Sequence, residues 1–230
     1  MKTPIMIFLP LIFLLLLLQP EAKAQDGWNF GLKGGLNMSW ISTPEVSGEP
    51  LSGTFGTRTS YNVGLFAEYG FNKHLYFQIP MNYDRRGFSY KESEGNNSTD
   101  ITIRANYLEI PLLIRYAVPV SDKVDIYGLL GPSIAYLVGG RIVGEKTVNG
   151  VVGDVNNKIT DSYTTTAIGI KAGLGIEIPF ADDKGATFFD VRYNYGFGHD
   201  MKQGGYYESS TISANSQVVS FVVGVKGYIE

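Results

Sequence analysis

Apolar and polar residues alternate along most of this chain, and alternation with a period of two is typical of an extended strand. From Trp28 onward it comes in repeated segments of about 9 to 13 residues. Segment 124–138 is apolar on both faces, so its phase stays open. The pattern predicts an all-β fold, an antiparallel up-and-down meander of about eight strands closed into a barrel. The eight segments are 28–40, 61–71, 75–84, 107–116, 124–138, 168–178, 189–197 and 219–226.

The connections between these segments also alternate, between short turns and long polar loops. The short ones are 70–74, 118–123 and 179–185, and the long ones are 41–60, 91–100, 143–162 and 201–215. Short turns at one end and long loops at the other are the connectivity of a transmembrane barrel of the outer membrane. Because both termini lie at the short-turn end, we expect the long loops to face the cell exterior.

Alternation alone does not say which face meets the surroundings, because a soluble lipocalin-type barrel has the same period with its apolar face inward. The polar face here is rich in glycine with scattered asparagine and serine, which suits a narrow interior. Arg85 and Arg104 share the apolar phase, but they lie at loop-side strand ends, where a cation costs about 0–1 kcal/mol. We therefore expect lipid outside. The apolar face carries aromatic residues toward strand ends, as in the girdles of membrane barrels: Trp28, Trp40, Tyr61, Tyr69, Tyr83, Tyr116 and Tyr195.

The N-terminus reads as a secretory signal peptide. Lys2 precedes the apolar run 5–18, and an A-x-A site follows at 22–24. The run is too short and too well bounded for a membrane-spanning helix. We expect a signal peptide at 1–24 and one outer-membrane β-barrel domain at 25–230.

The amino-acid composition limits the kinds of site and partner that the protein can have. The chain has 28 glycines, no cysteine and a net charge of −3. Absence of cysteine excludes lipid attachment at cysteine, disulfides and thiol catalysis, and near-neutral charge gives no reason to expect nucleic acid as a partner. Acidic residues in the loops lack calcium-loop spacing. We predict no metal, no cofactor and a monomer whose main partner is outer-membrane lipid.

Charged residues gather on the inward phase, five acids and six bases. An unpaired buried charge costs several kcal/mol, so these groups should pair. They predict either a salt-bridge plug that fills the barrel or, as the alternative, a proton- or ion-conducting path or polar ligand site. The eleven residues of this expected lumen network are Lys33, Glu68, Asp84, Arg86, Glu109, Arg115, Lys171, Glu177, Asp190, Arg192 and Lys226.

Only His74 and His199 could serve as a histidine base. His199 lies beside Asp200 at the expected outer rim, and with Asp84 and a nearby serine it could form an acid/base group. Two adjacent common residues at a loop edge are better interpreted as a solvated pair. We predict no catalytic residues, and a rim-site enzyme acting on lipid or peptide is the third functional alternative.

Two motifs resemble the PorT-like outer-membrane β-barrel proteins of the Bacteroidota: Gly31-Leu32-Lys33-Gly34-Gly35-Leu36-Asn37, and above all Tyr107-Leu108-Glu109-Ile110-Pro111-Leu112-Leu113-Ile114-Arg115-Tyr116. The resemblance covers nearly the whole mature chain. It implies an outer-membrane barrel, and the founding type is associated with protein export. Our leading expectation is a structural or surface-interaction role, and the alternative is a component of a secretion or transport assembly.

Overall fold

The computed structural model describes residues 27–46, 49–50, 53–121, 123–159, 166–180, 184–197 and 212–229. The expected signal peptide and the pair His199 and Asp200 lie outside these ranges. No helix in the described ranges is long and apolar enough to cross a membrane. The strands are β1 (Gly27–Val46), β2 (Glu49–Pro50), β3 (Thr54–Gly70), β4 (Leu75–Glu94), β5 (Asn97–Pro111), β6 (Leu113–Ser121), β7 (Val124–Val148), β8 (Val151–Lys158), β9 (Thr166–Pro179), β10 (Gly185–Phe197) and β11 (Ile212–Tyr228).

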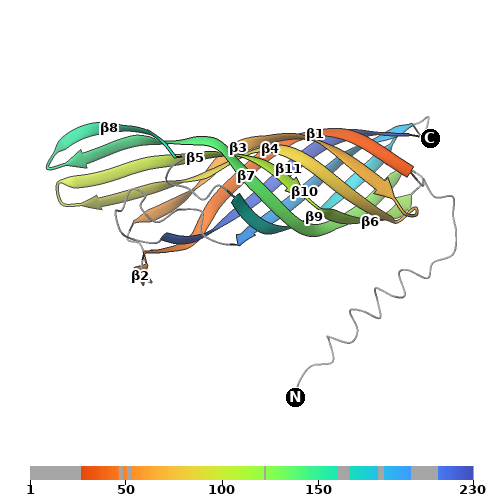
Figure 1. The fold of residues 1–230 in the computed structure, drawn as a ribbon, viewed down its shortest axis with the longest axis horizontal. Coiled ribbons are helices and arrows are strands. Elements are labelled where there is room, and N and C mark those ends of the chain that lie inside the picture. Colours follow the sequence, from red (N-terminus) through yellow and green to blue (C-terminus); the bar gives the residue numbers. More distant parts are fainter. Residues whose placement is uncertain are drawn as a thin grey trace, which may run out of the picture.

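The strands form one antiparallel sheet that closes on itself (Figure 1). The order runs β11, β10, β9, β7, β5, β4, β3, β1, and β1 pairs again with β11. This closing seam extends from Asn29 opposite Tyr228 to Val46 opposite Ile212. Closure gives every strand of the barrel wall two hydrogen-bonded neighbours, as a backbone in hydrocarbon requires. The predicted meander barrel is confirmed.

β5 and β6 act as one barrel strand despite the interruption at Leu112. Their register against β7 continues unchanged, with Pro111 opposite Ser133 and Ile114 opposite Leu130. The backbone N–H of Leu112 donates to the carbonyl of Pro132 at 2.9 Å. With β5 and β6 counted together, and β2 and β8 set aside as short strands outside the wall, the described residues form eight barrel strands, in agreement with the predicted number.

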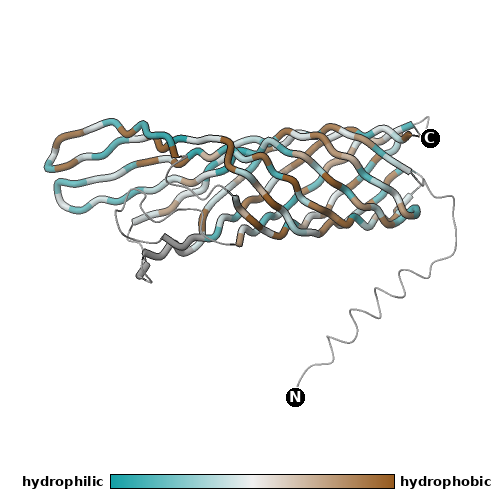
Figure 2. The backbone as a smooth tube through the Cα atoms, viewed as in Figure 1, coloured by the Kyte–Doolittle hydropathy of each residue, from teal (hydrophilic) through white to brown (hydrophobic). Residues whose placement is uncertain are grey.

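The apolar phase faces outward on every barrel strand. Leu174 is 73% exposed and Leu32 63%, fractions expected of a lipid-facing side chain and not of a protein core. Strand 124–138 joins this pattern, with Ile126, Leu130 and Ile134 exposed. Figure 2 shows apolar and polar residues alternating along the barrel strands. The aromatic residues expected at the two girdles are all exposed or half-buried.

Two of the expected loops are β-hairpins instead. Segment 91–100 is the tip of the β4–β5 hairpin, and segment 143–162 contains the end of β7 and all of β8. Much of 41–60 is also strand, whereas most of 201–215 lies outside the described residues. The prediction of loops was wrong because polar composition was equated with irregular structure. We call this end of the barrel the hairpin end and the opposite one the short-turn end.

The hairpins form one four-stranded sheet beyond the barrel, in the order β4, β5, β7, β8, at the left of Figure 1. Their tips are joined: the N–H of Gly150 donates to the carbonyl of Asn96 at 3.1 Å, and the N–H of Asn149 to Oδ1 of Asn97 at 2.8 Å. Asn149 and Gly150 have φ of 52° and 80°, the left-handed values of a tight hairpin turn. The projection is therefore ordered structure.

Candidate functional site

All eleven charged residues expected in the lumen lie inside the barrel, and none is more than 5% exposed. They do not form one continuous plug. They gather at two levels along the barrel, joined by a smaller group, with apolar side chains between and above them.

The first level lies near the short-turn end and consists of Glu68, Arg115, Glu177 and Lys226. The Lys226 ammonium lies 2.9 Å from a carboxylate oxygen of each glutamate. Arg115 contacts Glu177 at 2.5 Å and Glu68 at 3.6 Å, and its guanidinium lies 4.1 Å from the ring centre of Tyr127. Two acids meet two bases, so this level is electrically balanced.

An apolar layer follows, built around Phe66 and Phe188. Their ring centres are 5.6 Å apart in an edge-to-face arrangement, and both side chains are buried. Each ring lies over a glycine of a neighbouring strand: a Cβ on Gly31 would come within 2.4 Å of the Phe66 ring, and one on Gly224 within 2.4 Å of Phe188. The glycines of the inner face thus make room for two aromatic rings. The remaining members of the layer are Tyr76, Leu113, Ala117, Tyr127, Leu129 and Val222.

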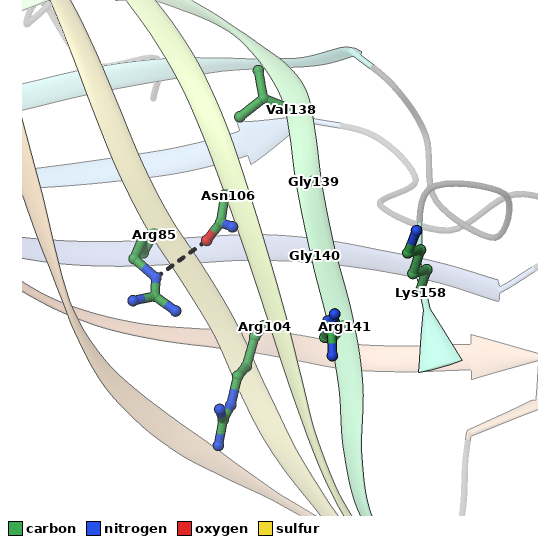
Figure 3. A pocket seen from close by; sticks show the side chains of 8 residues that line it. All are labelled: Arg85, Arg104, Asn106, Val138, Gly139, Gly140, Arg141 and Lys158. Carbon is green, nitrogen blue, oxygen red and sulfur yellow. Dashed lines mark hydrogen bonds between the residues drawn. The ribbon is translucent and has the colours of Figure 1, made fainter. Parts of the chain in front are cut away.

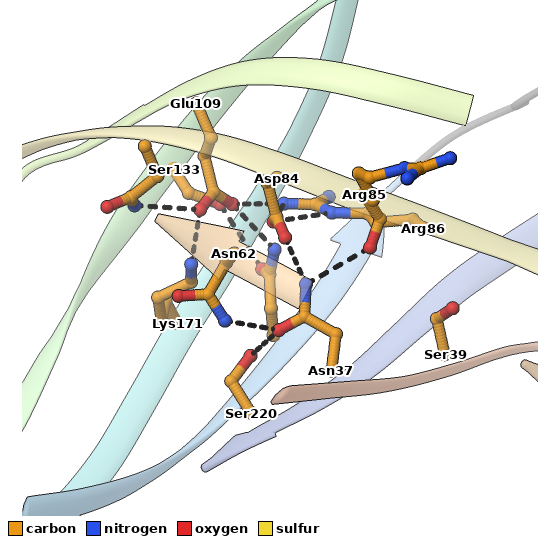
Figure 4. Close-up of polar contacts among 12 residues, drawn as sticks. Asn37, Ser39, Asn62, Asp84, Arg85, Arg86, Glu109, Ser133, Lys171 and Ser220 are labelled. Carbon is orange, nitrogen blue, oxygen red and sulfur yellow. Dashed lines mark hydrogen bonds and ion pairs between the residues drawn. The ribbon is translucent and has the colours of Figure 1, made fainter. Parts of the chain in front are cut away.

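The second charged level has Glu109 at its centre (Figure 4). Its carboxylate forms ion pairs with Arg86 and Lys171, and it accepts hydrogen bonds from Asn194 at 2.9 Å and Asn82 at 3.3 Å. Arg86 also contacts Asp84 at 2.6 Å. This level again has two acids and two bases. Glu109 contacts groups from β4, β9 and β10, so it ties strands together across the lumen.

Amides and hydroxyls extend this second level (Figure 4). Asn37 donates to Asp84, and its Oδ1 accepts from Asn62 at 2.6 Å and Ser220 at 2.8 Å. The expected network contained charged residues alone and so missed this neutral part. Its signal was available, because Asn37 and Ser220 share the inward parity of Lys33 and Lys226 on their strands.

A smaller group lies between the levels. Asp190 pairs with Arg192 at 2.6 Å and accepts a hydrogen bond from the Tyr127 hydroxyl at 2.8 Å. Lys33 interacts electrostatically with Asp190 and Arg192 but forms no ion pair with any described residue. It is thus the sixth base that five acids leave over.

Beyond the second level the interior is apolar, which corrects the expectation of a polar lumen throughout. Phe88, Ile103 and Leu137 are buried there, where the barrel passes into the hairpin sheet. Alternation extends past the membrane-spanning part, but the inward residues there are the apolar ones. Other buried members of this cluster are Ile41, Tyr90, Ala105, Tyr107, Ala135, Ile142, Val155 and Ile159.

The described residues give little support for a metal site or a histidine-based catalytic site. No group of three or more acidic or histidine side chains there could bind a metal ion. The His74 ring lies in the turn between β3 and β4, where Nδ1 is 2.8 Å from the carbonyl of Ala117 and the ring stacks on Tyr116. Asp84, a candidate partner of His199, is committed to Arg86 and Asn37.

This chain resembles known outer-membrane barrel proteins in family and in fold. A family model described as "Outer membrane protein beta-barrel domain" matches residues 20–200. The outer membrane protein OprG from Pseudomonas aeruginosa has a TM-score of 0.53 at 11% identity, covering 90% of this chain and 100% of that chain. Neisserial surface protein A has a TM-score of 0.42 at 16% identity, covering 87% and 97%. A search of curated proteins found no match.

A closed antiparallel barrel with an apolar outer wall and a filled, charge-paired interior defines the class of transmembrane β-barrels. The family match covers most of the sequence. The chain belongs to the outer membrane protein beta-barrel family, and its place is the outer membrane.

Proposed function

We propose that this protein is a non-conducting barrel that anchors an ordered surface projection, and that the projection makes the functional contact. The observation that carries the proposal is the contrast between a lumen occupied by successive layers of buried side chains and a four-stranded sheet that extends beyond the wall. An eight-stranded interior is just wide enough for side chains to fill. Function is therefore assigned to the hairpin sheet, facing the cell exterior.

The tip of the projection supports this assignment. Val148 and Val151 are cross-strand neighbours and are 48% and 72% exposed, and Val152 is 61% exposed. Exposed β-branched apolar residues clustered at the end of a hydrogen-bonded hairpin suit contact with another surface better than contact with water. We propose a protein partner at the cell surface, bound by a monomeric barrel that lipid surrounds.

Crosslinking and conductance together test the proposal. A photo-crosslinking amino acid at position 151 should give discrete protein adducts in intact cells, and one at Lys123, at the short-turn end, should not. The purified barrel in a planar bilayer should pass no steady current. Steady current through the wild type, or no adduct from position 151, would count against the proposal.

The alternative function, a component of a secretion or transport assembly, rests on the PorT-like motif at 107–116 and the Bacteroidota origin it implies. Such a component must contact periplasmic machinery, so adducts should then form at Lys123 in place of position 151. A defect in protein export after deletion of the gene would also favour this alternative.

We propose no enzymatic activity and no cofactor. The histidine that could act as a base at the rim lies outside the described residues, and Asp84 is engaged in the lumen. A His199→Ala variant that lost a lipid- or peptide-hydrolysing activity of the wild type would favour the third alternative, a rim-site enzyme. Export by a signal peptide at 1–24 stays a prediction, which the N-terminal sequence of the mature protein would test.

A further inference from the structure

A hollow of about 490 Å³ opens on the outer wall, where β4, β5, β7 and β8 run side by side (Figure 3). Four of its lining residues are cationic, and among the described part of the chain no acidic residue lines it. The lining residues are Arg85, Arg104, Asn106, Val138, Gly139, Gly140, Arg141 and Lys158.

Strand register brings the cations together. Arg104 on β5 lies directly opposite Arg141 on β7, and Arg141 lies opposite Lys158 on β8. Arg85 on β4 lies opposite Asn106, two residues along β5 from Arg104. Like charges directly opposite each other in a sheet are destabilising. The fold therefore concentrates positive charge here at a cost to its own stability.

A β-bulge turns Arg141 into this cluster. Before the bulge the even-numbered residues of β7 face outward, as Ile134 and Tyr136 show. The register shifts by one residue at Val138, since Tyr107 lies opposite Leu137 and Asn106 opposite Gly139. Without that extra residue Arg141 would point into the lumen. Bulges commonly re-aim side chains at functional positions. Beside this one lies Gly139, where an added Cβ would meet no atom within 4 Å.

Two of the four cations, Arg85 and Arg141, have neutral partners among the described residues. Arg85 donates to Oδ1 of Asn106 at 3.1 Å, and its guanidinium lies 5.1 Å from the ring centre of Tyr61. Arg141 reaches Oδ1 of Asn156 at 3.4 Å. None of the four cations forms an ion pair with an acid in the described part of the chain. The lumen arginines, in contrast, are all paired.

The hollow lies at the edge of the lipid-facing belt. Along β4, the outward residues Ile79, Met81 and Tyr83 lead up to Arg85, and along β7 the outward Tyr136 and Val138 precede Arg141. Tyrosine marks the depth at which lipid headgroups lie. The cations therefore face sideways at headgroup depth, with apolar side chains beside them on the membrane side.

We propose that this hollow binds the phosphate-bearing headgroup of a membrane lipid. Arg85 and Arg104 present planar guanidinium groups that suit paired hydrogen bonds to phosphate oxygens. Arg141 and Lys158 add positive charge, and Val138 contacts the first acyl carbons. The anion relieves the repulsion among the four cations. The site is at headgroup depth in either orientation of the barrel, so the inference stands independently of the proposed surface function.

The test uses the full-length barrel in phosphatidylcholine nanodiscs that contain labelled phosphatidic acid as a minor component. Arg85→Gln combined with Arg104→Gln should weaken phosphatidic acid binding by about tenfold or more, since charge-assisted hydrogen bonds are lost. Arg141→Gln combined with Lys158→Gln should weaken it less. The control, Lys91→Gln combined with Lys123→Gln, removes two exposed charges elsewhere and should leave binding unchanged.

Each outcome decides the proposal. A loss in both site variants but not in the control, with heat-resistant folded migration on gels retained, supports it. Equal affinity for phosphatidic acid and phosphatidylcholine, or an equal loss in the control, overturns it. Competition by soluble glycerol phosphate as strong as that by phosphatidic acid would overturn the lipid source. Both site variants should fold, because each removes like-charge repulsion.

Discussion

Cations cluster both in the lumen and on the outer wall, but the two clusters differ in whether the cations are paired with acids. In the lumen, Arg86, Arg115, Lys171, Arg192 and Lys226 each meet a carboxylate. On the wall, four cations lie together, and none of them forms an ion pair with an acid among the described residues. Buried pairs make each charge depend on its partner, whereas grouped like charges weaken a sheet. The paired set therefore belongs to the architecture of the barrel, and the unpaired set is available to a ligand.

The largest effect should come from breaking a lumen pair. Glu109→Gln leaves Arg86 and Lys171 without their shared carboxylate, which should cost about 3–5 kcal/mol of unfolding free energy. Urea unfolding of the barrel in liposomes measures this cost. Asp100→Asn breaks the exposed pair with Lys91, whose atoms are 2.7 Å apart, and should cost only about 0–1 kcal/mol.

The conductance of the same Glu109→Gln variant distinguishes the two hypotheses for the lumen charges, a structural plug and a conducting path. A structural plug loses stability while the bilayer current stays absent. Unchanged stability together with an altered current would instead identify a conducting path along these residues.

A smaller effect should follow from placing a charge on the wall where lipid tails lie. Leu130 faces outward in the middle of the barrel part of β7 and is 54% exposed. Leu130→Lys should cost about 2–4 kcal/mol, and the matched control Ile126→Lys, nearer the short-turn end of the strand, about 0–1 kcal/mol. The same unfolding assay applies. Equal costs at the two positions would show that the wall does not face hydrocarbon.

The smallest effect should come from the wall cations, and its sign should be opposite. Arg104→Gln removes a like charge facing Arg141 and should raise the unfolding free energy by about 0.2–1 kcal/mol in lipid without phosphate monoesters. Added phosphatidic acid should stabilise the wild type and reverse the order. A clear loss of stability in Arg104→Gln in both lipids would assign the arginine a structural role instead.

Odd- and even-numbered residues of a strand lie on opposite faces of the sheet. This parity explains why much of the structure can be predicted from the sequence. Once strand 107–116 is phased by its apolar residues, Glu109 and Arg115 must point inward, and the same reasoning placed Lys33 and Asp190 there. A closed barrel in hydrocarbon leaves no other face for these groups. Arg85 and Arg104 were likewise placed on the outer face at strand ends.

The height of a residue along the barrel axis is harder to predict from the sequence than the face on which the residue lies. Parity does not say that Phe66 and Phe188 form a layer between two charged levels, because that depends on the relative shift of β3 and β10. The bulge at Val138 reverses the parity of β7, so Arg141 could not be assigned to the wall. The hairpins were missed although Asn149-Gly150 between valines is a strong hairpin signal.

The seam between β1 and β11 has a consequence for the order of events in biogenesis. Of the described strands β1 is made first and β11 last, so the first edge of the sheet is covered by the strand that is made latest among them. Until then both edges of the growing sheet expose unpaired backbone groups, which invite aggregation. The barrel can therefore close only once β11 is available to pair with β1, however early the other strands have been made.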